Sequence, residues 1–115
     1  MEMTPEQLKK LAEIAGISPL DEIEVLGRTA IYAWVPTPFN QFVRTEWMPH
    51  VKIEHAIMVA DKAFEFWQLS RGKVIGRFRC TGVYKSKEHG ALESRSDWLS
   101  TPAEAICAAA LAIGG

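Results

Sequence analysis

Long apolar runs are missing from this chain of 115 residues. None of its apolar stretches approaches the ~20 residues that a membrane-spanning helix needs. The first residues are polar and acidic, which does not fit a secretory signal, so we expect the protein to be cytoplasmic. Cysteine is scarce as well, because Cys80 and Cys107 are the only two. Both lie in apolar patterns, which indicates buried thiols and not a disulfide framework.

Net charge is also close to zero. The formal charge of −1 gives the chain no overall attraction to nucleic acid or to a membrane. That average conceals an asymmetry, since residues 1–27 contain six acidic residues and only two lysines. Residues 66–90 instead oppose Glu88 with six cations, namely Arg71, Lys73, Arg77, Arg79, Lys85 and Lys87. The simplest interpretation is that both segments form solvated faces.

Motifs that carry catalytic chemistry are missing too. The chain has no glycine-rich phosphate loop before a helix and no Gly-x-Ser-x-Gly nucleophile motif. His50, Glu54 and His55 form the one tight cluster of candidate ligands, but their spacing does not match that of zinc proteases. We favour capping or surface roles for them. We therefore expect no metal site, no cofactor and no enzymatic activity.

Regular structure, in contrast, is clearly indicated. Three segments have the apolar period of helices: residues 5–15 after Thr4, residues 51–64, and residues 102–113 after Thr101. Strand composition marks residues 30–35, a hairpin of residues 64–70 and 74–80 around the turn 71–73, and a charged edge strand at 91–98. Residues 20–27 fit either a helix or a strand, and we favour a helix.

These elements predict the α+β class. We expect a single domain over residues 1–115, with an antiparallel sheet of three to four strands packed by three to four helices in an α/β/α-type sandwich. The last helix carries no charge between Ala105 and Ile113, so it must be buried. We expect it to cover the apolar side of the hairpin and to leave Arg77 and Arg79 in solvent.

Two segments are candidate binding surfaces. Residues 36–50 show no sustained period of either kind and display Phe39, Phe42, Trp47 and Met48. We favour the interpretation that these side chains fold back over the end of the core, and the alternative is an exposed binding patch. The hairpin offers cations beside aromatic residues, a combination that can bind single-stranded nucleic acid. Its candidate residues are Arg77, Arg79, Lys85 and Lys87, together with Trp67 and Tyr84.

The order of motifs in the second half of the chain is distinctive. Pro49-His50 precedes a helix with Ile53-Glu54-His55-Ala56-Ile57, two strands follow, and the last helix contains Thr101-Pro102, Ala105-Ile106-Cys107 and Ala110-Leu111. This order resembles the small bacteriophage proteins called phage ABA sandwich domain proteins. Their closing helix opens with threonine-proline, continues with alanine-isoleucine-cysteine and ends with alanine-leucine. The central helix departs from the family, which usually opens it with a tyrosine-serine-threonine-aspartate type cap, where this chain has Val51-Lys52-Ile53-Glu54.

The resemblance covers roughly residues 45–113, and more loosely residues 20–27. It implies a sheet layered between helices and a phage or prophage origin, but no activity, cofactor or catalytic residue. We therefore expect a non-catalytic phage accessory protein, located in the host cytoplasm, that binds another protein such as a host defence or regulatory factor. The alternative is a nucleic-acid-binding module that uses the basic hairpin. Self-association through the strand that carries Arg95 is a further option, and a membrane is not an expected partner.

Overall fold

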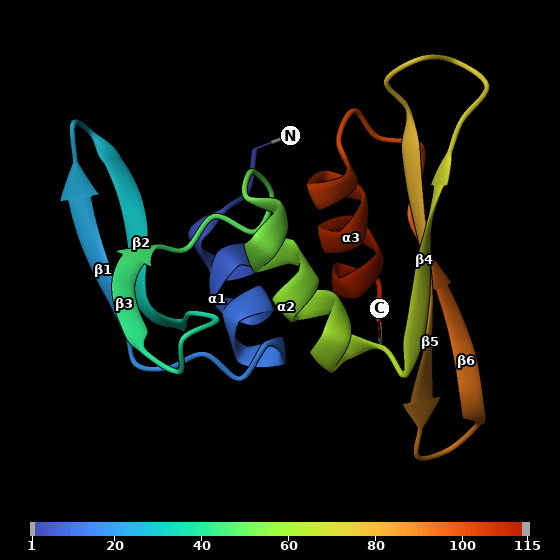
Figure 1. Cartoon of the computed structure of the whole chain (residues 1–115), viewed down its shortest axis with the longest axis horizontal. Coiled ribbons are helices and arrows are strands. Elements are labelled where there is room, and N and C mark those ends of the chain that lie inside the picture. Colours follow the sequence, from blue (N-terminus) through green and yellow to red (C-terminus); the bar gives the residue numbers. More distant parts are fainter. Residues whose placement is uncertain (1, 114–115) are drawn as a thin grey trace.

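The computed structural model describes residues 2–113 and places three helices between two sheets (Figure 1). The helices are α1 (Pro5–Ile14), α2 (Ile53–Ala63) and α3 (Pro102–Leu111). The first sheet contains β1 (Leu20–Val25), β2 (Arg28–Pro36) and β3 (Phe42–Glu46) in that spatial order. The second contains β4 (Phe66–Arg71), β5 (Phe78–Ser86) and β6 (Gly90–Arg95), again in that order. All four strand pairs are antiparallel.

The predicted α+β class is confirmed, and the layers are arranged differently from the predicted order. The helices form the inner layer, with one sheet on each side (Figure 1). Helix α1 packs on β2, α3 packs on the three strands of the second sheet, and α2 contacts both other helices. The reason lies in α3, which is apolar on all sides after its first turn. Such a helix is stable only when every face is covered, here by other helices and by a sheet.

Helix α3 covers the β4–β5–β6 sheet as expected. Its buried residues point in several directions around the helix: Ala103, Glu104, Ala105, Ile106, Cys107, Ala109 and Ala110. The Thr101 hydroxyl caps the helix by accepting a hydrogen bond from the Glu104 amide at 3.1 Å. The Ser94 hydroxyl of β6 donates to the Ala109 carbonyl at 2.7 Å. This bond, in the last turn of the helix, fixes α3 to the sheet.

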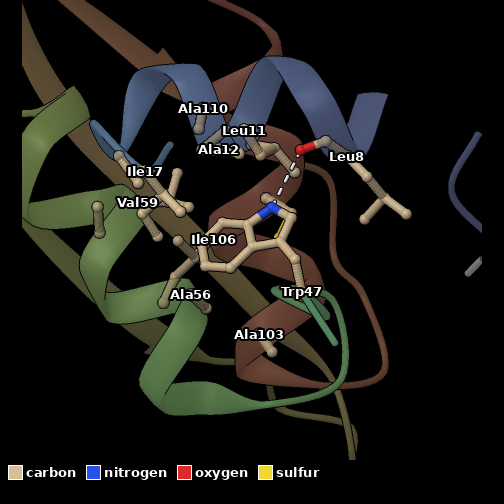
Figure 2. Close-up of a cluster of buried hydrophobic side chains, with 14 of the residues drawn as sticks. Leu8, Leu11, Ala12, Ile17, Trp47, Ala56, Val59, Ala103, Ile106 and Ala110 are labelled. Atoms are coloured by element: carbon tan, nitrogen blue, oxygen red, sulfur yellow. Dashed lines mark hydrogen bonds between the residues drawn. The ribbon is translucent and has the colours of Figure 1, made fainter. Parts of the chain in front are cut away.

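Trp47 lies at the centre of the core, between the helices (Figure 2). It follows directly after β3, and its amide donates to the Ile31 carbonyl of β2 at 2.7 Å. Its indole Nε1 donates to the Leu8 carbonyl of α1 at 3.0 Å. Its ring stacks on His55 of α2, with 5.0 Å between ring centroids. One residue therefore connects the first sheet, through its backbone amide, with two helices, through its side chain.

Residues 20–27 form a strand and a turn, so the favoured prediction of a helix is wrong. The turn residues Leu26 and Gly27 have φ angles of 50° and 80°. A two-residue turn with positive φ at both positions matches the twist of the strands that it joins. It pairs Val25 with Arg28 and starts the hairpin of β1 and β2.

Two further boundaries differ from the prediction. Residues 36–50 are not wholly irregular, because they contain β3, which pairs with β2 from Tyr32 to Pro36. The turn between β4 and β5 is longer than expected and spans residues 72–77. As a result, Val74 lies in an exposed loop and not on the apolar side of a strand.

Candidate functional site

Large apolar side chains are exposed together on the hairpin of β2 and β3. The exposed fractions are 82% for Phe39, 64% for Phe42, 50% for Val43 and 44% for Trp34. These four residues are named the hairpin patch. A groove of about 390 Å³ lies beside it, lined by Trp34, Pro36 and Phe42 from the hairpin, by residues 15–18 after α1, and by Met58, Asp61 and Lys62 of α2. Trp34 and Phe42 thus belong to both the patch and the groove, whereas Val43 pairs with the buried Val35 and faces the other side of the sheet.

The loop of this hairpin is built by local hydrogen bonds. The Thr37 amide donates to the Gln41 carbonyl at 2.7 Å, and the Asn40 amide donates to the Thr37 carbonyl at 3.2 Å. Asn40 has a φ of 58°, a conformation that asparagine tolerates better than most residues. The loop therefore presents Phe39 at its tip, while Phe42 pairs with Pro36 at the end of the ladder.

The groove is apolar at its base and carries few charges at its rim. The one carboxylate among the described residues that line it is Asp61, which accepts a hydrogen bond from Trp67 Nε1 at 3.1 Å. Lys62 is the neighbouring cation. Because the polar atoms do not converge on one point, the groove suits the apolar side chains of a partner better than an anion or a metal ion.

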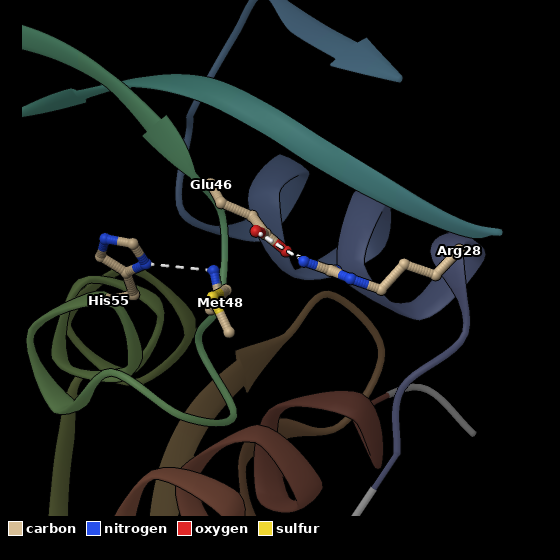
Figure 3. A network of polar contacts seen from close by, with 4 residues as sticks. All are labelled: Arg28, Glu46, Met48 and His55. Atoms are coloured by element: carbon tan, nitrogen blue, oxygen red, sulfur yellow. Dashed lines mark hydrogen bonds and ion pairs between the residues drawn. The ribbon is translucent and has the colours of Figure 1, made fainter. Parts of the chain in front are cut away.

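Trp47 and Met48 do not belong to this surface. Trp47 is fully buried, so for this residue the favoured interpretation, that it folds back over the core, is confirmed, and the alternative of an exposed binding residue is wrong. Met48 is partly buried, and its amide donates to His55 Nδ1 at 3.1 Å (Figure 3). Phe39 and Phe42 are the two predicted residues of segment 36–50 that face solvent, so the favoured interpretation that they fold back over the core is wrong for both.

The ion pair between Arg28 and Glu46 holds the end of β3 against the start of β2 (Figure 3). Two guanidinium nitrogens of Arg28 donate to the two carboxylate oxygens of Glu46, at 2.8 and 3.1 Å. This hydrogen bonding holds the pKa of Glu46 below its usual value. The ion pair fixes Glu46, the residue that precedes Trp47, and its role is structural.

The cluster of His50, Glu54 and His55 is divided by the fold. His55 is buried in α2, where its Nδ1 acts as an acceptor and burial lowers its pKa, so its ring is neutral and structural. His50 lies in the turn before α2, and burial lowers its pKa as well. Glu54 is exposed. Within residues 2–113, no group of three or more His, Cys, Asp or Glu side chains could hold a metal ion.

The basic hairpin residues are distributed over both ends of the second sheet. Arg77 is exposed in the loop before β5, and Lys87 is exposed in the turn after β5. Arg79 is half-buried with its guanidinium 4.5 Å from the centre of the Trp98 ring, and Lys85 pairs with Glu65 at 3.3 Å. Trp67 and Tyr84 instead pack against the core. The structure therefore does not place these two aromatic rings among the cations.

Both cysteines are buried thiols with raised pKa values. Burial raises the pKa of Cys80 to about 11 and that of Cys107 to about 12. Because the thiolate is the reactive form, we expect neither thiol to react with Ellman's reagent in the native protein at pH 8. The native rate should lie on the order of 100-fold or more below that of a free thiol. Both thiols should react after unfolding in guanidinium, and rapid native labelling of either would contradict the prediction.

Sequence reasoning missed two residues of the hairpin patch. Trp34 lies in the predicted strand 30–35, and Val43 lies in the segment without a sustained period. The signal for Trp34 was present, because it stands between Ala33 and Val35, which are both buried. Alternation along a strand then places Trp34 on the other face.

Comparisons of the chain with protein-family models, with curated proteins and with solved structures gave no match. The resemblance to phage ABA sandwich domain proteins therefore stays a prediction. Functional inference rests on the geometry of the chain itself.

Proposed function

We propose that the protein is a non-catalytic accessory protein that binds another protein through the hairpin patch and the adjacent groove. The observation that carries the proposal is the exposure of Phe39, Phe42 and Trp34 on one hairpin. Aromatic residues dominate the energetics of protein interfaces because they bury large areas with few rotatable bonds. A partner that places apolar side chains in the groove would cover Trp34 and Phe42, which line it, and would reach Phe39 at the tip of the same hairpin.

The surroundings of the patch also suit a protein partner. Arg44 of β3 lies 4.8 Å over the Tyr32 ring and pairs with Asp21 at 3.2 Å, so its charge is held on the first sheet. An apolar centre with charged residues around it is the usual arrangement of a specific interface. The protein then acts by binding its partner and not by catalysing a reaction.

The identity of the partner is part of the proposal. Following the resemblance to phage ABA sandwich domain proteins, we propose a phage origin, action in the host cytoplasm, and a host defence or regulatory factor as the partner. A small protein that carries no catalytic step acts by blocking or redirecting such a factor.

Affinity capture from host lysate tests this proposal when matched variants are compared. The test variant is Phe39→Ser/Phe42→Ser, and the control is Leu26→Asn, which removes a fully exposed aliphatic side chain from the other hairpin of the same sheet. Each substitution is at the surface and should change stability by less than about 0.5 kcal/mol. Wild type and the control should recover the same protein, and the double variant should lose it.

Binding of the recovered protein is then measured with purified components. Loss of each aromatic hot spot should cost about 2 kcal/mol or more, which weakens the Kd by at least roughly 30-fold per residue. Equal affinity of the double variant and wild type would overturn the proposal, as would the absence of any partner that distinguishes them.

A further inference from the structure

The loop between β4 and β5, residues 72–77, exposes a second apolar feature. Ile75 is 98% exposed and Val74 is 68% exposed. Isolated exposed aliphatic residues are common, but here two consecutive ones occupy the end of a hairpin. Figure 1 shows this loop, in yellow, projecting beyond the helices at the upper right. The pair is therefore free to contact a surface that the rest of the molecule does not reach.

Cations surround this apolar pair. Arg71, Lys73 and Arg77 are all exposed, and among residues 2–113 none of them forms an ion pair with a carboxylate. Residues 66–87 contain no acidic residue at all. Even with Asp97, which precedes Trp98, this end of the sheet is positively charged. Basic residues elsewhere are often neutralised, as in the pairs of Lys9 with Glu22 and of Arg44 with Asp21.

The loop rests on a defined support. The Gly72 amide donates to the Arg77 carbonyl at 2.9 Å, which closes the loop at its base. Arg79 packs on the Trp98 ring beneath it, at 4.5 Å. A hollow of about 450 Å³ is lined by Gly72, Lys73, Val74, Arg77 and Trp98. An aromatic ring, cations and aliphatic side chains thus meet at one end of the molecule.

We propose that this loop docks the protein on the surface of an anionic lipid bilayer. Val74 and Ile75 enter the boundary between headgroups and acyl chains, while Arg71, Lys73 and Arg77 contact the anionic headgroups. Trp98 lines the same hollow as Val74, and tryptophan is enriched at membrane interfaces. The inference is independent of the hairpin patch, which belongs to the other sheet and would stay available to a protein partner.

This peripheral contact differs from a membrane span. Within residues 2–113, none of the helices has both the length and the apolar character for crossing a bilayer. A formal charge of −1 predicts no membrane partner, because it gives the chain no overall attraction to a bilayer. The structure shows that cations and exposed aliphatic residues are concentrated at one loop, so the average does not describe this surface.

Chemistry favours a bilayer over nucleic acid. Binding of single strands uses aromatic rings that stack on bases, and aliphatic side chains such as Val74 and Ile75 cannot stack. The Trp98 ring carries the Arg79 guanidinium on one face. A nucleic acid would therefore contact only the cations, and Val74 and Ile75 would contribute nothing to its binding.

Vesicle cosedimentation tests the proposal with the full chain. Vesicles of phosphatidylcholine alone and with about one third phosphatidylglycerol are compared at low salt, and we expect at least roughly tenfold stronger binding to the anionic vesicles. Val74→Ser/Ile75→Ser should weaken this binding about tenfold or more. Lys73→Gln/Arg77→Gln should weaken it on the order of 25-fold, about fivefold per charge. Leu26→Asn removes an exposed aliphatic residue from the acidic first sheet and should bind like wild type.

The results distinguish an anionic bilayer from a nucleic acid as the ligand of the loop. No binding to anionic vesicles at low salt overturns the proposal, and so does unchanged binding of Val74→Ser/Ile75→Ser. A fluorescent single-stranded oligonucleotide is titrated in parallel. If it binds more tightly than the anionic vesicles and only the charge variant weakens it, the loop is a nucleic-acid site instead. Vesicle binding by Phe39→Ser/Phe42→Ser should equal that of wild type, which keeps this test separate from the protein partner.

Discussion

Replacement of Trp47 by alanine should remove a large part of the stability of the fold. The indole is fully buried, so its loss creates a cavity between α1, α2 and α3, and such substitutions cost about 3–5 kcal/mol. The Leu8 carbonyl also loses its donor, the Trp47 Nε1, in a buried position. A domain of this size is typically stable by about 5–15 kcal/mol in total. We expect a large shift of the urea midpoint, measured by far-ultraviolet circular dichroism.

Two variants identify the source of the loss. Trp47→Phe keeps a ring beside His55 but has no donor for Leu8, so it should cost about 1–2 kcal/mol for the hydrogen bond plus a smaller cavity. Trp34→Ala removes a tryptophan that is nearly half exposed and should cost far less than Trp47→Ala. If Trp47→Ala unfolded at the same urea concentration as wild type, the central position of Trp47 would be refuted.

The helices were predictable because their signals are local. The Thr4 hydroxyl accepts from the Gln7 amide, and the Gln7 side-chain oxygen accepts from the Thr4 amide, which is the complete capping box that the sequence indicates. Gly16 ends that helix with a φ of 72°, as its position predicts. The apolar period of α2 and the uncharged surface of α3 also follow from a few neighbouring residues. Caps and periodicity depend on the chain within one or two turns.

The layer order was not predictable because it depends on which distant elements pair. Residues 20–25 read equally well as a helix, and the outcome was decided by a turn at Leu26 and Gly27 that pairs them with β2. Strand β3 was concealed by Pro36 and Pro38, yet Pro36 is the last residue of the β2 ladder and pairs with Phe42. Recognition of these two strands would have predicted a second sheet.

The candidate site was only partly predictable, because the exposure of its side chains also depends on contacts between distant residues. Phe39 and Trp47 belong to one segment and have similar composition around them, but one is exposed and the other is buried. Their difference comes from the Thr37–Gln41 loop and from the hydrogen bond to Leu8, which joins residues 39 positions apart. Periodicity within segment 36–50 carries no information about that contact.

Replacement of Gly82 by alanine should destabilise the protein, although alanine is normally favoured over glycine within a strand. Gly82 lies in the central strand β5 between Trp67 and Ser94, and a Cβ at this position would stand well inside van der Waals contact with the Phe64 ring. Alanine in a strand is otherwise favoured over glycine by roughly 0.5–1 kcal/mol. Overpacking typically costs about 1–3 kcal/mol, so the net effect should be a loss of stability, measured by thermal and urea unfolding.

The Phe64 ring is the origin of this loss, and a double-mutant cycle tests it. Phe64 is buried where the chain leaves α2, and its ring covers Gly82 because no side chain separates them. In a Phe64→Leu background the alanine has more room, so Gly82→Ala should cost clearly less than in wild type, with a coupling of about 1 kcal/mol or more. Thr81→Ala, on the opposite face of β5, should show no coupling to Phe64→Leu. Equal costs of Gly82→Ala in both backgrounds would mean that the close approach of ring and backbone does not set the identity of residue 82.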